Sequence, residues 1–432
     1  MSAPARVAVL APGLPADALG LPSFCTAHPG AIRAILSHGA RHGLPVLIEA
    51  TCNQVNQEGG YTGRTPAEFA TWLLGLSEET GARLVLGGDH LGPNPWRREP
   101  AEAAMAKGEA LVAAFAAAGA QKIHLDASMA LGGEPQPDPV LVAARAARLA
   151  AAAEAAAPDP GRLSYVVGTE VPTPGGEAEG HALSVTTPDG LRETLETHRA
   201  AFARLGLQAA FERVMAVVVQ PGVDFGPSEV AAYDPAAARA LVAALPPEPG
   251  PVFEAHSTDY QPDDALAALA RDRFAILKVG PELTFAWREA LVALDQVEAQ
   301  LRAPGERAGA VAVVLAEMRR DPSDWQGHYC EGDALPVEAA LLFGLSDRVR
   351  YYWARPVVAH AVERLVAGLP AGTIPRPLLR QYLPLVDARL PRGAPSPSAA
   401  GILAGAVEAV ADRYWRACLG HALAPGGNDS RM

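Results

Sequence analysis

The chain has 432 residues, which is enough for several small domains or for one α/β barrel with additions. Hydrophobic residues make up 49% of the chain and charged residues 19%, which is typical of folded globular proteins and excludes a disordered chain. The net charge is −12, because 36 Lys and Arg stand against 48 Asp and Glu. Such a charge opposes binding to nucleic acid or to an anionic membrane surface, so we expect neither as a partner.

The cysteines and the N-terminal residues point to a reducing compartment. Cys25, Cys52, Cys330 and Cys418 lack C-x-x-C spacing, so the sequence indicates neither a disulfide framework nor a thiolate zinc site. The first 20 residues have one basic residue and a short apolar run broken by proline and glycine, unlike a signal peptide. No stretch approaches the roughly 18 uncharged apolar residues of a membrane span. We therefore expect a cytoplasmic protein.

Short apolar runs alternate with longer segments of helical periodicity along the whole chain. We expect strands at residues 46–50, 84–87, 122–125, 163–167, 215–219, 252–255, 275–279 and 349–353. Alanine-rich segments between them, such as residues 101–118 and 140–157, place Leu and Val at helical spacing. Eight strands that alternate with helices predict an α/β fold, a (β/α)8 TIM barrel.

The predicted barrel covers residues 1–360 and carries additions. Residues 303–336 are too many for a plain connection, so we expect an inserted helix and a lid or partner-facing loop there. Residues 361–424 exceed what one closing helix needs and predict a C-terminal helical extension. The last residues, 425–432, are expected to be disordered.

Polar residues stand where the predicted strands end, which is the side of a barrel that carries active sites. A single polar strand end is explained by contact with water, but eight in succession indicate a site. The strand-end candidates are Glu49, Asp89, His90, Asp126, Glu170, Gln220, His256, Asp259, Lys278, Glu282, Tyr352 and Arg355.

The densest signal is the glycine-rich turn at residues 87–94, Gly-Gly-Asp-His-Leu-Gly-Pro-Asn. Adjacent residues at a strand end point in different directions, so His90 can bind a metal while Asp89 moves a proton. His256 ends another strand. Two imidazoles from separate strands and a carboxylate suit a divalent metal with open positions, zinc or manganese, cobalt or nickel.

The third metal ligand is left open by the sequence. Glu170, in the run Gly-Thr-Glu-Val-Pro, is favoured by residue type and is also a catalytic candidate. Gln220 and Asp224 compete with it, because both follow the fifth predicted strand.

The strand at residues 122–125 is expected to send polar groups into the barrel. Alternation places Lys122, His124 and Asp126 on one side, which makes Asp126 a further catalytic candidate. A lysine inside a barrel, Lys122 or Lys278, raises a Schiff-base mechanism as an alternative. A metal-dependent site would instead use these lysines as partners of carboxylates, which the nearby histidines favour.

Residues 49–63 are rich in amides, hydroxyls and glycine. Asn53 and Gln54 offer both donors and acceptors, as a polyhydroxylated substrate requires, although a solvated loop has a similar composition. Cys52 has no basic neighbour in the sequence, so we interpret it as a small packed residue.

Six strings occur in order and carry a family resemblance: IEATCNQVNQEGGYTG, GGDHLGPNPW, KIHLDASM, GTEVPTPGG, EAHSTDYQ and LKVGPELTFAWREAL. Over roughly residues 28–360 the chain resembles the accessory-subunit family of class II D-tagatose-1,6-bisphosphate aldolase, once described as tagatose-6-phosphate kinases. More distantly it is similar to the zinc-dependent class II fructose-bisphosphate aldolases. The resemblance implies a (β/α)8 barrel in which His90 and His256 bind zinc and Asp89 transfers protons. Neither a P-loop nor a kinase signature is present.

Two departures from the aldolases bear on the substrate and the metal. Their other zinc histidine falls near residues 220–224, where this chain has none, so the metal site must differ or recruit Glu170. Their Gly-Gly-Ser phosphate loop becomes Ser257-Thr258-Asp259, and an acid there repels phosphate. We therefore expect a free or lightly phosphorylated sugar.

Two functions follow from the resemblance. The protein is either a metal-dependent enzyme that epimerises a ketohexose such as tagatose or fructose at C4 by retro-aldol chemistry, or a non-catalytic subunit of a separate aldolase. The acidic and imidazole residues favour chemistry, because a scaffold has no use for them when buried. The sequence does not determine whether the chain forms a homo-oligomer. The expected substrate-binding residues are Glu49, Asn53, Gln54, Lys122, Gln220, Asp259, Lys278, Glu282, Tyr352 and Arg355.

Overall fold

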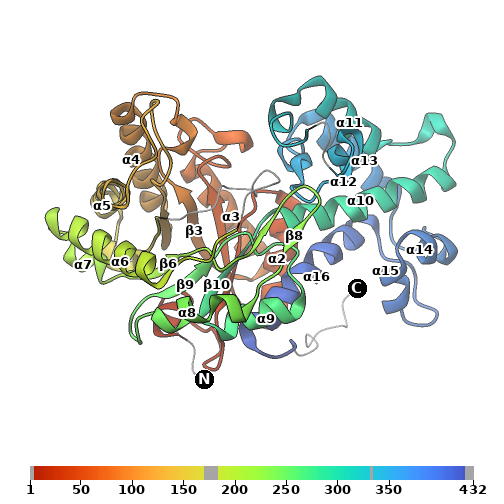
Figure 1. Ribbon diagram of the computed structural model, residues 1–432. Coiled ribbons are helices and arrows are strands. Elements are labelled where there is room, and N and C mark those ends of the chain that lie inside the picture. The colour runs from red at the N-terminus through yellow and green to blue at the C-terminus, as the bar shows by residue number, and fades with distance from the viewer. Residues whose placement is uncertain (1–3, 170–182, 331–333, 424–432) are drawn as a thin grey trace.

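The computed structural model describes residues 4–169, 183–330 and 334–423, and its centre is a closed parallel barrel (Figure 1). Around the barrel the strands follow the order β1-β10-β9-β6-β5-β4-β3-β2. They are β1 (Leu21–Phe24), β2 (Pro45–Thr51), β3 (Arg83–Leu91), β4 (Lys122–Leu125), β5 (Ser164–Val167), β6 (Val214–Val218), β9 (Val252–Ala255) and β10 (Phe274–Val279). β7 (Asp224–Phe225) and β8 (Val230–Ala231) form a separate antiparallel pair. The predicted TIM barrel is confirmed.

The first helices of the chain surround this barrel. They are α1 (Ala5–Leu10), α2 (Pro29–His42), α3 (Pro66–Thr80), α4 (Ala101–Ala117), α5 (Pro139–Ala156), α6 (Pro188–Arg204), α7 (Gln208–Phe211), α8 (Pro235–Ala244) and α9 (Asp263–Arg271). Several begin at a proline that follows a capping side chain, and Thr65 with Glu68 forms a capping box on α3. The local sequence therefore specifies where these helices start.

The remaining helices form a layer beside the barrel, at the right of Figure 1, and the first and last of them extend from this layer onto the barrel. They are α10 (Pro281–Leu301), α11 (Ala310–Arg320), α12 (Val337–Phe343), α13 (Pro356–Gly368), α14 (Arg376–Tyr382), α15 (Pro384–Arg389) and α16 (Ala399–Leu419). This layer has a hydrophobic core of its own, which includes Leu294, Val358 and Leu365. A second, larger core fills the barrel and the space under its outer helices.

The strand predicted at residues 349–353 is wrong. This segment is the short 3-10 helix η6 (Arg348–Tyr351), which follows Asp347 in a left-handed conformation with φ of 42°. The eighth strand is instead β1, which pairs with β10 on one side and with β2 on the other. Because the closed barrel has no free edge, an apolar run later in the chain has no strand to pair with.

Helix α16 completes the outer ring of the barrel. It packs against α2, α9 and β1. The backbone N–H groups of Leu19 and Gly20 donate to the Cys418 carbonyl over 2.6 and 3.1 Å. The helical extension predicted from residue 361 onward thus includes a helix of the barrel itself.

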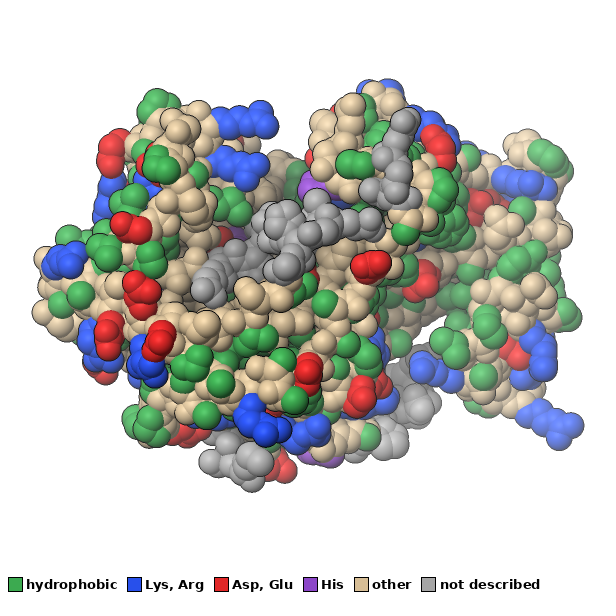
Figure 2. Space-filling model, viewed as in Figure 1, with side chains coloured by type: hydrophobic (Ala, Val, Ile, Leu, Met, Phe, Trp, Pro, Cys, Tyr) green, Lys and Arg blue, Asp and Glu red, His purple; other side chains and the backbone are tan. Residues whose placement is uncertain are grey.

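Other sequence expectations concern the surface and the ends. The segment predicted as an insertion at 303–336 contains α11, and the tail predicted at 425–432 lies outside the described residues. Among the described helices none combines the length and apolarity of a membrane span. Figure 2 shows Lys and Arg interspersed with Asp and Glu over the visible face, so charge there is spread rather than gathered in one patch.

Candidate functional site

A cavity of about 530 Å³ opens at the carboxyl ends of the barrel strands. Its floor includes Asp89, His90, His256 and Lys278, which come from β3, from the end of β9 and from β10. Its wall includes residues 350, 351 and 353 of the helical layer. The site therefore lies between the barrel and the C-terminal helices, at the end of the barrel where the sequence predicted it.

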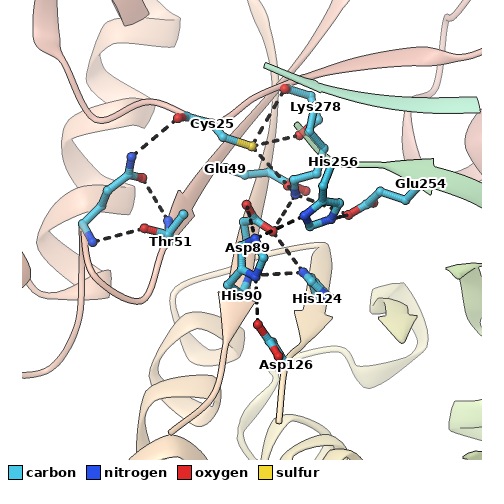
Figure 3. Close-up of polar contacts among 12 residues, drawn as sticks. Cys25, Glu49, Thr51, Asp89, His90, His124, Asp126, Glu254, His256 and Lys278 are labelled. Atoms are coloured by element: carbon cyan, nitrogen blue, oxygen red, sulfur yellow. Dashed lines mark hydrogen bonds and ion pairs between the residues drawn. The ribbon is translucent and has the colours of Figure 1, made fainter. Parts of the chain in front are cut away.

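A bulge in β3 brings Asp89 and His90 into the same site. The pairing of β3 with β4 shifts register between Gly88 and Leu91, and His90 has a positive φ of 46°. A bulge turns one extra residue toward the partner strand, so neighbouring side chains no longer alternate strictly. Figure 3 shows both side chains in one cluster, although a regular strand would send them to opposite faces.

Three imidazoles face one another at the floor of the cavity. The ring centres of His90, His124 and His256 are 4.8, 5.0 and 5.1 Å apart, which makes a nearly equilateral triangle (Figure 3). Asp89 completes a group whose possible ligand atoms all lie within 4.8 Å of one another. Three nitrogen donors and one open position are the usual set of a catalytic zinc site.

Two carboxylates fix which nitrogens face inward. Asp126 lies 2.8 Å from Nδ1 of His90, and Glu254 lies 2.9 Å from Nε2 of His256. The opposite nitrogens, Nε2 of His90 and Nδ1 of His256, are 3.2 Å apart. Two nitrogen ligands of a tetrahedral zinc ion are about 3.3 Å apart, and a carboxylate behind each ring is the common support of such ligands. The donor geometry thus fits a divalent metal.

His124 supplies the third nitrogen donor among the described residues. Its Nδ1 lies 3.0 Å from Asp89, and its buried Nε2 has no hydrogen-bond partner within the described part of the chain. The sequence placed this side chain inside the barrel through strand alternation but gave it no role, because it lies within a predicted strand and not at the end of one. Glu170, the predicted third ligand, lies outside the described residues, and its role stays a prediction.

The competing third ligand Gln220 is used within its own loop. Its side-chain oxygen accepts hydrogen bonds from the backbone N–H groups of Gly222 and Val223 over 2.8 and 3.0 Å. Asp224 is in β7 and is not part of the imidazole cluster. Neither residue is placed to complete the site.

Two lysines and their carboxylate partners lie among and below the imidazoles. Lys122 contacts Glu49 at 2.5 Å and Glu254 at 2.7 Å, and all three side chains are fully buried. Lys278 contacts Asp89 at 2.7 Å and also pairs with Glu49. With Asp126 the site holds four carboxylates against two ammonium groups, an excess of two negative charges when the imidazoles are neutral. A divalent cation would neutralise this excess.

Burial and charge set the protonation of these groups. Burial lowers the pKa of His256 to about 3, which keeps its ring neutral as a metal ligand requires. Although burial opposes the charged forms, His90 and Lys278 hold the pKa of Asp89 well below its usual value. Burial likewise opposes the ammonium form of Lys278, but Asp89 and Glu254 raise its pKa well above the usual value. A lysine held as ammonium is no nucleophile, which disfavours the Schiff-base alternative.

The predicted substrate-binding residues fall into three groups. Those on the cavity wall are Asn53, Gln54, Asp259 and Lys278. Those buried beneath it are Glu49 and Lys122. Those outside the lining are Gln220, Glu282, Tyr352 and Arg355.

Tyr352 and Arg355 stabilise the helical layer. The Tyr352 hydroxyl donates to the Asp321 carbonyl over 2.6 Å, and Arg355 pairs with the Asp321 carboxylate at 2.6 Å. Their neighbours Arg350 and Trp353 line the cavity instead. A strand and a 3-10 helix direct different side chains of the same segment toward a given side. The wrong strand assignment therefore selected Tyr352 and Arg355, which do not line the cavity.

The cysteines differ in their relation to the site. Cys52 is fully buried, and burial raises the pKa of its thiol, so it is a packed residue as predicted. Cys25 lines the cavity, and its sulfur lies 3.8 Å from a carboxylate oxygen of Glu49. Cys25 follows β1 directly, so the missed strand concealed it.

Comparison with known proteins identifies the family. A family model described as D-tagatose-1,6-bisphosphate aldolase subunit GatZ/KbaZ-like matches residues 14–419. The chain is 51% identical over 373 residues, 84% of this chain and 87% of the other, to D-tagatose 6-phosphate 4-epimerase of Agrobacterium fabrum. It is 46% identical over 409 residues, 93% of this chain and 96% of the other, to D-tagatose-1,6-bisphosphate aldolase subunit GatZ of Salmonella gallinarum.

A solved structure from Sinorhizobium meliloti 1021, described as a probable tagatose 6 phosphate kinase, has the same fold. The TM-score is 0.84 and the sequence identity 47%, over 92% of this chain and 100% of that chain. With the family model matching nearly the whole chain, this protein belongs to the D-tagatose-1,6-bisphosphate aldolase subunit GatZ/KbaZ-like family.

Proposed function

We propose that the protein is a metal-dependent enzyme that epimerises a ketohexose 6-phosphate at C4, interconverting sugars of the tagatose and fructose type. The triangle of three imidazoles beside an ionised Asp89, at the floor of a cavity of sugar size, carries the proposal. The relative from Agrobacterium fabrum, at 51% identity, is named for this reaction.

The chemistry divides between an ion and the side chains around it. His90, His124 and His256 would hold a divalent ion, which when bound supplies Lewis acidity at the sugar's C2 carbonyl. Asp89 accepts the proton of the C4 hydroxyl as the bond between C3 and C4 breaks. After the aldehyde half has turned its other face, Asp89 returns the proton to the C4 oxygen as the bond re-forms.

The neighbours of these groups act by positioning. Asp126 fixes His90 through Nδ1 and is itself held by the Ser128 hydroxyl over 2.7 Å, so we assign it an orienting role rather than proton transfer. Lys278 keeps Asp89 ionised from 2.7 Å away. These fixed contacts preorganise the site before the sugar binds.

The part of the cavity wall that the helical layer provides is suited to bind a phosphate group. Arg350 lines it, and its guanidinium is held by the backbone carbonyls of Ser346 and Asp347 and by the Tyr351 hydroxyl. Arg64 lines the same cavity. A planar guanidinium fixed on one edge presents its remaining donors to phosphate oxygens, so we propose Arg350 as the residue that binds the 6-phosphate.

One assay tests the proposal. Protein dialysed against chelator is supplied with Zn²⁺, Mn²⁺, Co²⁺ or Ni²⁺ and incubated with fructose 6-phosphate, tagatose 6-phosphate, the free sugars and tagatose 1,6-bisphosphate. We expect the two monophosphates to interconvert only after metal is restored, and the double variant His90→Ala, His256→Ala to be inactive. Interconversion that continues in the chelated protein would contradict the mechanism.

A second candidate function rests on the relatives named as aldolase subunits. The chain is 46% identical to the Salmonella gallinarum subunit over nearly the full length of both proteins. In that function the protein would bind a catalytic aldolase subunit and raise its activity without turning over sugar itself. Mixing the two proteins distinguishes the functions: a subunit activates the aldolase even when it carries Asp89→Asn, whereas epimerisation requires the intact carboxylate.

A further inference from the structure

Helix α10 begins at the wall of the cavity. It has 21 residues, and Gly280 and Pro281 at its start line the cavity together with Ser257 and Asp259. The first N–H groups of a helix have no partner within the helix, and they carry partial positive charge. An empty helix start in a sugar-phosphate cavity would attract a phosphate group.

In this protein Asp259 occupies that position. One of its carboxylate oxygens accepts hydrogen bonds from the backbone N–H of Gly280 over 2.9 Å and of Glu282 over 2.8 Å. Asp259 belongs to the segment after β9, and Gly280 at the head of α10 provides no cap of its own. A Cβ on Gly280 would lie 3.2 Å from the Cys25 carbonyl, which leaves little space for a local capping residue.

The carboxylate is held there against opposing forces. Asp259 is only 3% exposed. Burial and the nearby Glu282 raise its pKa to about 7, although the two backbone hydrogen bonds favour the charged form. In either protonation state the side chain still fills the space in front of both N–H groups. A phosphate can reach them only by displacing it.

We propose that Asp259 is a specificity-determining residue that excludes a phosphate group from the β9 and β10 side of the cavity. The assignment of the ligand as a sugar rests on the proposed function. Arg350 lies close enough to favour the charged form of Asp259, so a ketohexose with one phosphate binds with that phosphate on Arg350 and not at the start of α10. A bisphosphate would place its second phosphate against an occupied helix start and a carboxylate.

Binding measurements test this without any catalytic assay. Inorganic phosphate and tagatose 1,6-bisphosphate are titrated into the wild-type protein and into Asp259→Gly by calorimetry, with tagatose 6-phosphate as reference. We expect Asp259→Gly to bind inorganic phosphate and the bisphosphate at least about tenfold more tightly than the wild type, because two N–H donors become free. Asp259→Ser, which keeps a short polar side chain, serves if the glycine variant does not fold.

The matched control is Asp138→Gly. Asp138 also caps a helix start, that of α5, where it accepts from Leu141 N–H over 2.8 Å, but it is exposed and outside the cavity. It should leave phosphate binding as in the wild type. The proposal is overturned if neither Asp259 variant gains affinity for inorganic phosphate, or if the wild type binds bisphosphate as tightly as monophosphate. Because inorganic phosphate contains no sugar, the first result is independent of whether the protein is an epimerase.

Discussion

The backbone at His90 explains how two adjacent side chains reach the same cluster. Its φ of 46° and the bulge beside it place Asp89 and His90 in one cluster, where a regular strand would separate them. A non-glycine residue in the left-handed region costs free energy and is retained where surrounding contacts hold it. Here the contacts of His90 with His124 and Asp126 do so.

Asp89→Asn tests the proton transfer. The amide keeps the shape of the carboxylate but cannot accept a proton, so we expect turnover to fall by about 10² to 10⁴ with metal content near normal. Turnover, bound metal and thermal midpoint are measured on one preparation. Full activity in the metal-loaded variant would contradict proton transfer by Asp89. A loss of stability alone would show that Asp89 has a structural role.

A pair of single variants decides the third metal ligand. If His124 is the ligand, His124→Ala should lower zinc affinity by about 100-fold or more, since even loss of a supporting group costs about 10- to 100-fold. Glu170→Ala should then leave affinity nearly unchanged. Competition with a chromophoric chelator measures both, and the reverse order of effects would restore Glu170 as the ligand.

Gly92 allows β3 and the loop after β4 to approach. A Cβ at this position would lie 1.8 Å from the Asp126 carbonyl, so Gly92→Ala must displace Asp126 and, through it, His90. We expect a loss of about 1–3 kcal/mol in the free energy of unfolding together with weaker metal binding. Gly75→Ala in α3 is the control, because a Cβ there meets no atom of the described residues within 4 Å and alanine favours a helix. Denaturant titration should show a lower free energy of unfolding for Gly92→Ala and a higher one for Gly75→Ala than for the wild type.

At the scale of elements, the sequence predicted seven of the eight barrel strands to within one residue at each end, except that β3 continues four residues further. These strands are continuous apolar runs between helices, the form that buried parallel strands take. β1 was missed because Leu21–Phe24 is four residues long and contains a proline. The false strand at 349–353 is rich in aromatic and β-branched residues, but in the fold they pack within the helical layer.

Three residues of the cavity floor were predictable because each closely follows a predicted strand. Asp89, His90 and His256 stand at the cavity, as their strand-end position indicated. His124 and Cys25 were not assigned a role, because His124 lies within a strand and Cys25 follows the strand that was missed. Their place in the site arises from barrel closure, which depends on contacts between distant segments.

Helix α6 contributes to the pH dependence of stability through His198. This ring is fully buried, Nδ1 contacts the Thr194 carbonyl at 2.8 Å, and burial lowers its pKa to about 4. Because the folded state binds this proton less readily than the unfolded state, the stability present above about pH 6.5 is lost as pH falls toward 4. The loss at pH 4 is on the order of 3 kcal/mol.

His198→Leu isolates this contribution. The variant cannot titrate at this position, so its free energy of unfolding should fall less than that of the wild type between pH 7 and pH 4.5. Urea titrations at several pH values measure the difference. Parallel pH profiles for the two proteins would show that His198 takes no part in the loss.

At the scale of the whole molecule, the barrel and the helical layer share one site. Arg350 and Trp353 from the layer line the same cavity as Asp89 and Lys278 from the barrel. Two long helices, α10 and α16, connect the layer to the barrel, and they pack on each other. Direct packing therefore joins the two parts of the chain that line the cavity.

Because α16 completes the outer ring of helices, the two ends of the chain must meet during folding. Arg41 of α2 pairs with Glu408 of α16 at 2.6 Å, although the two residues are 367 positions apart. The entropic cost of closing a loop grows only with the logarithm of its length. Closing this loop therefore costs about 2 kcal/mol more free energy than closing a loop one tenth as long. The search for such distant contacts lowers the folding rate far more than it lowers the stability of the folded protein. The completed ring should thus form late in folding, after the strands that it encloses.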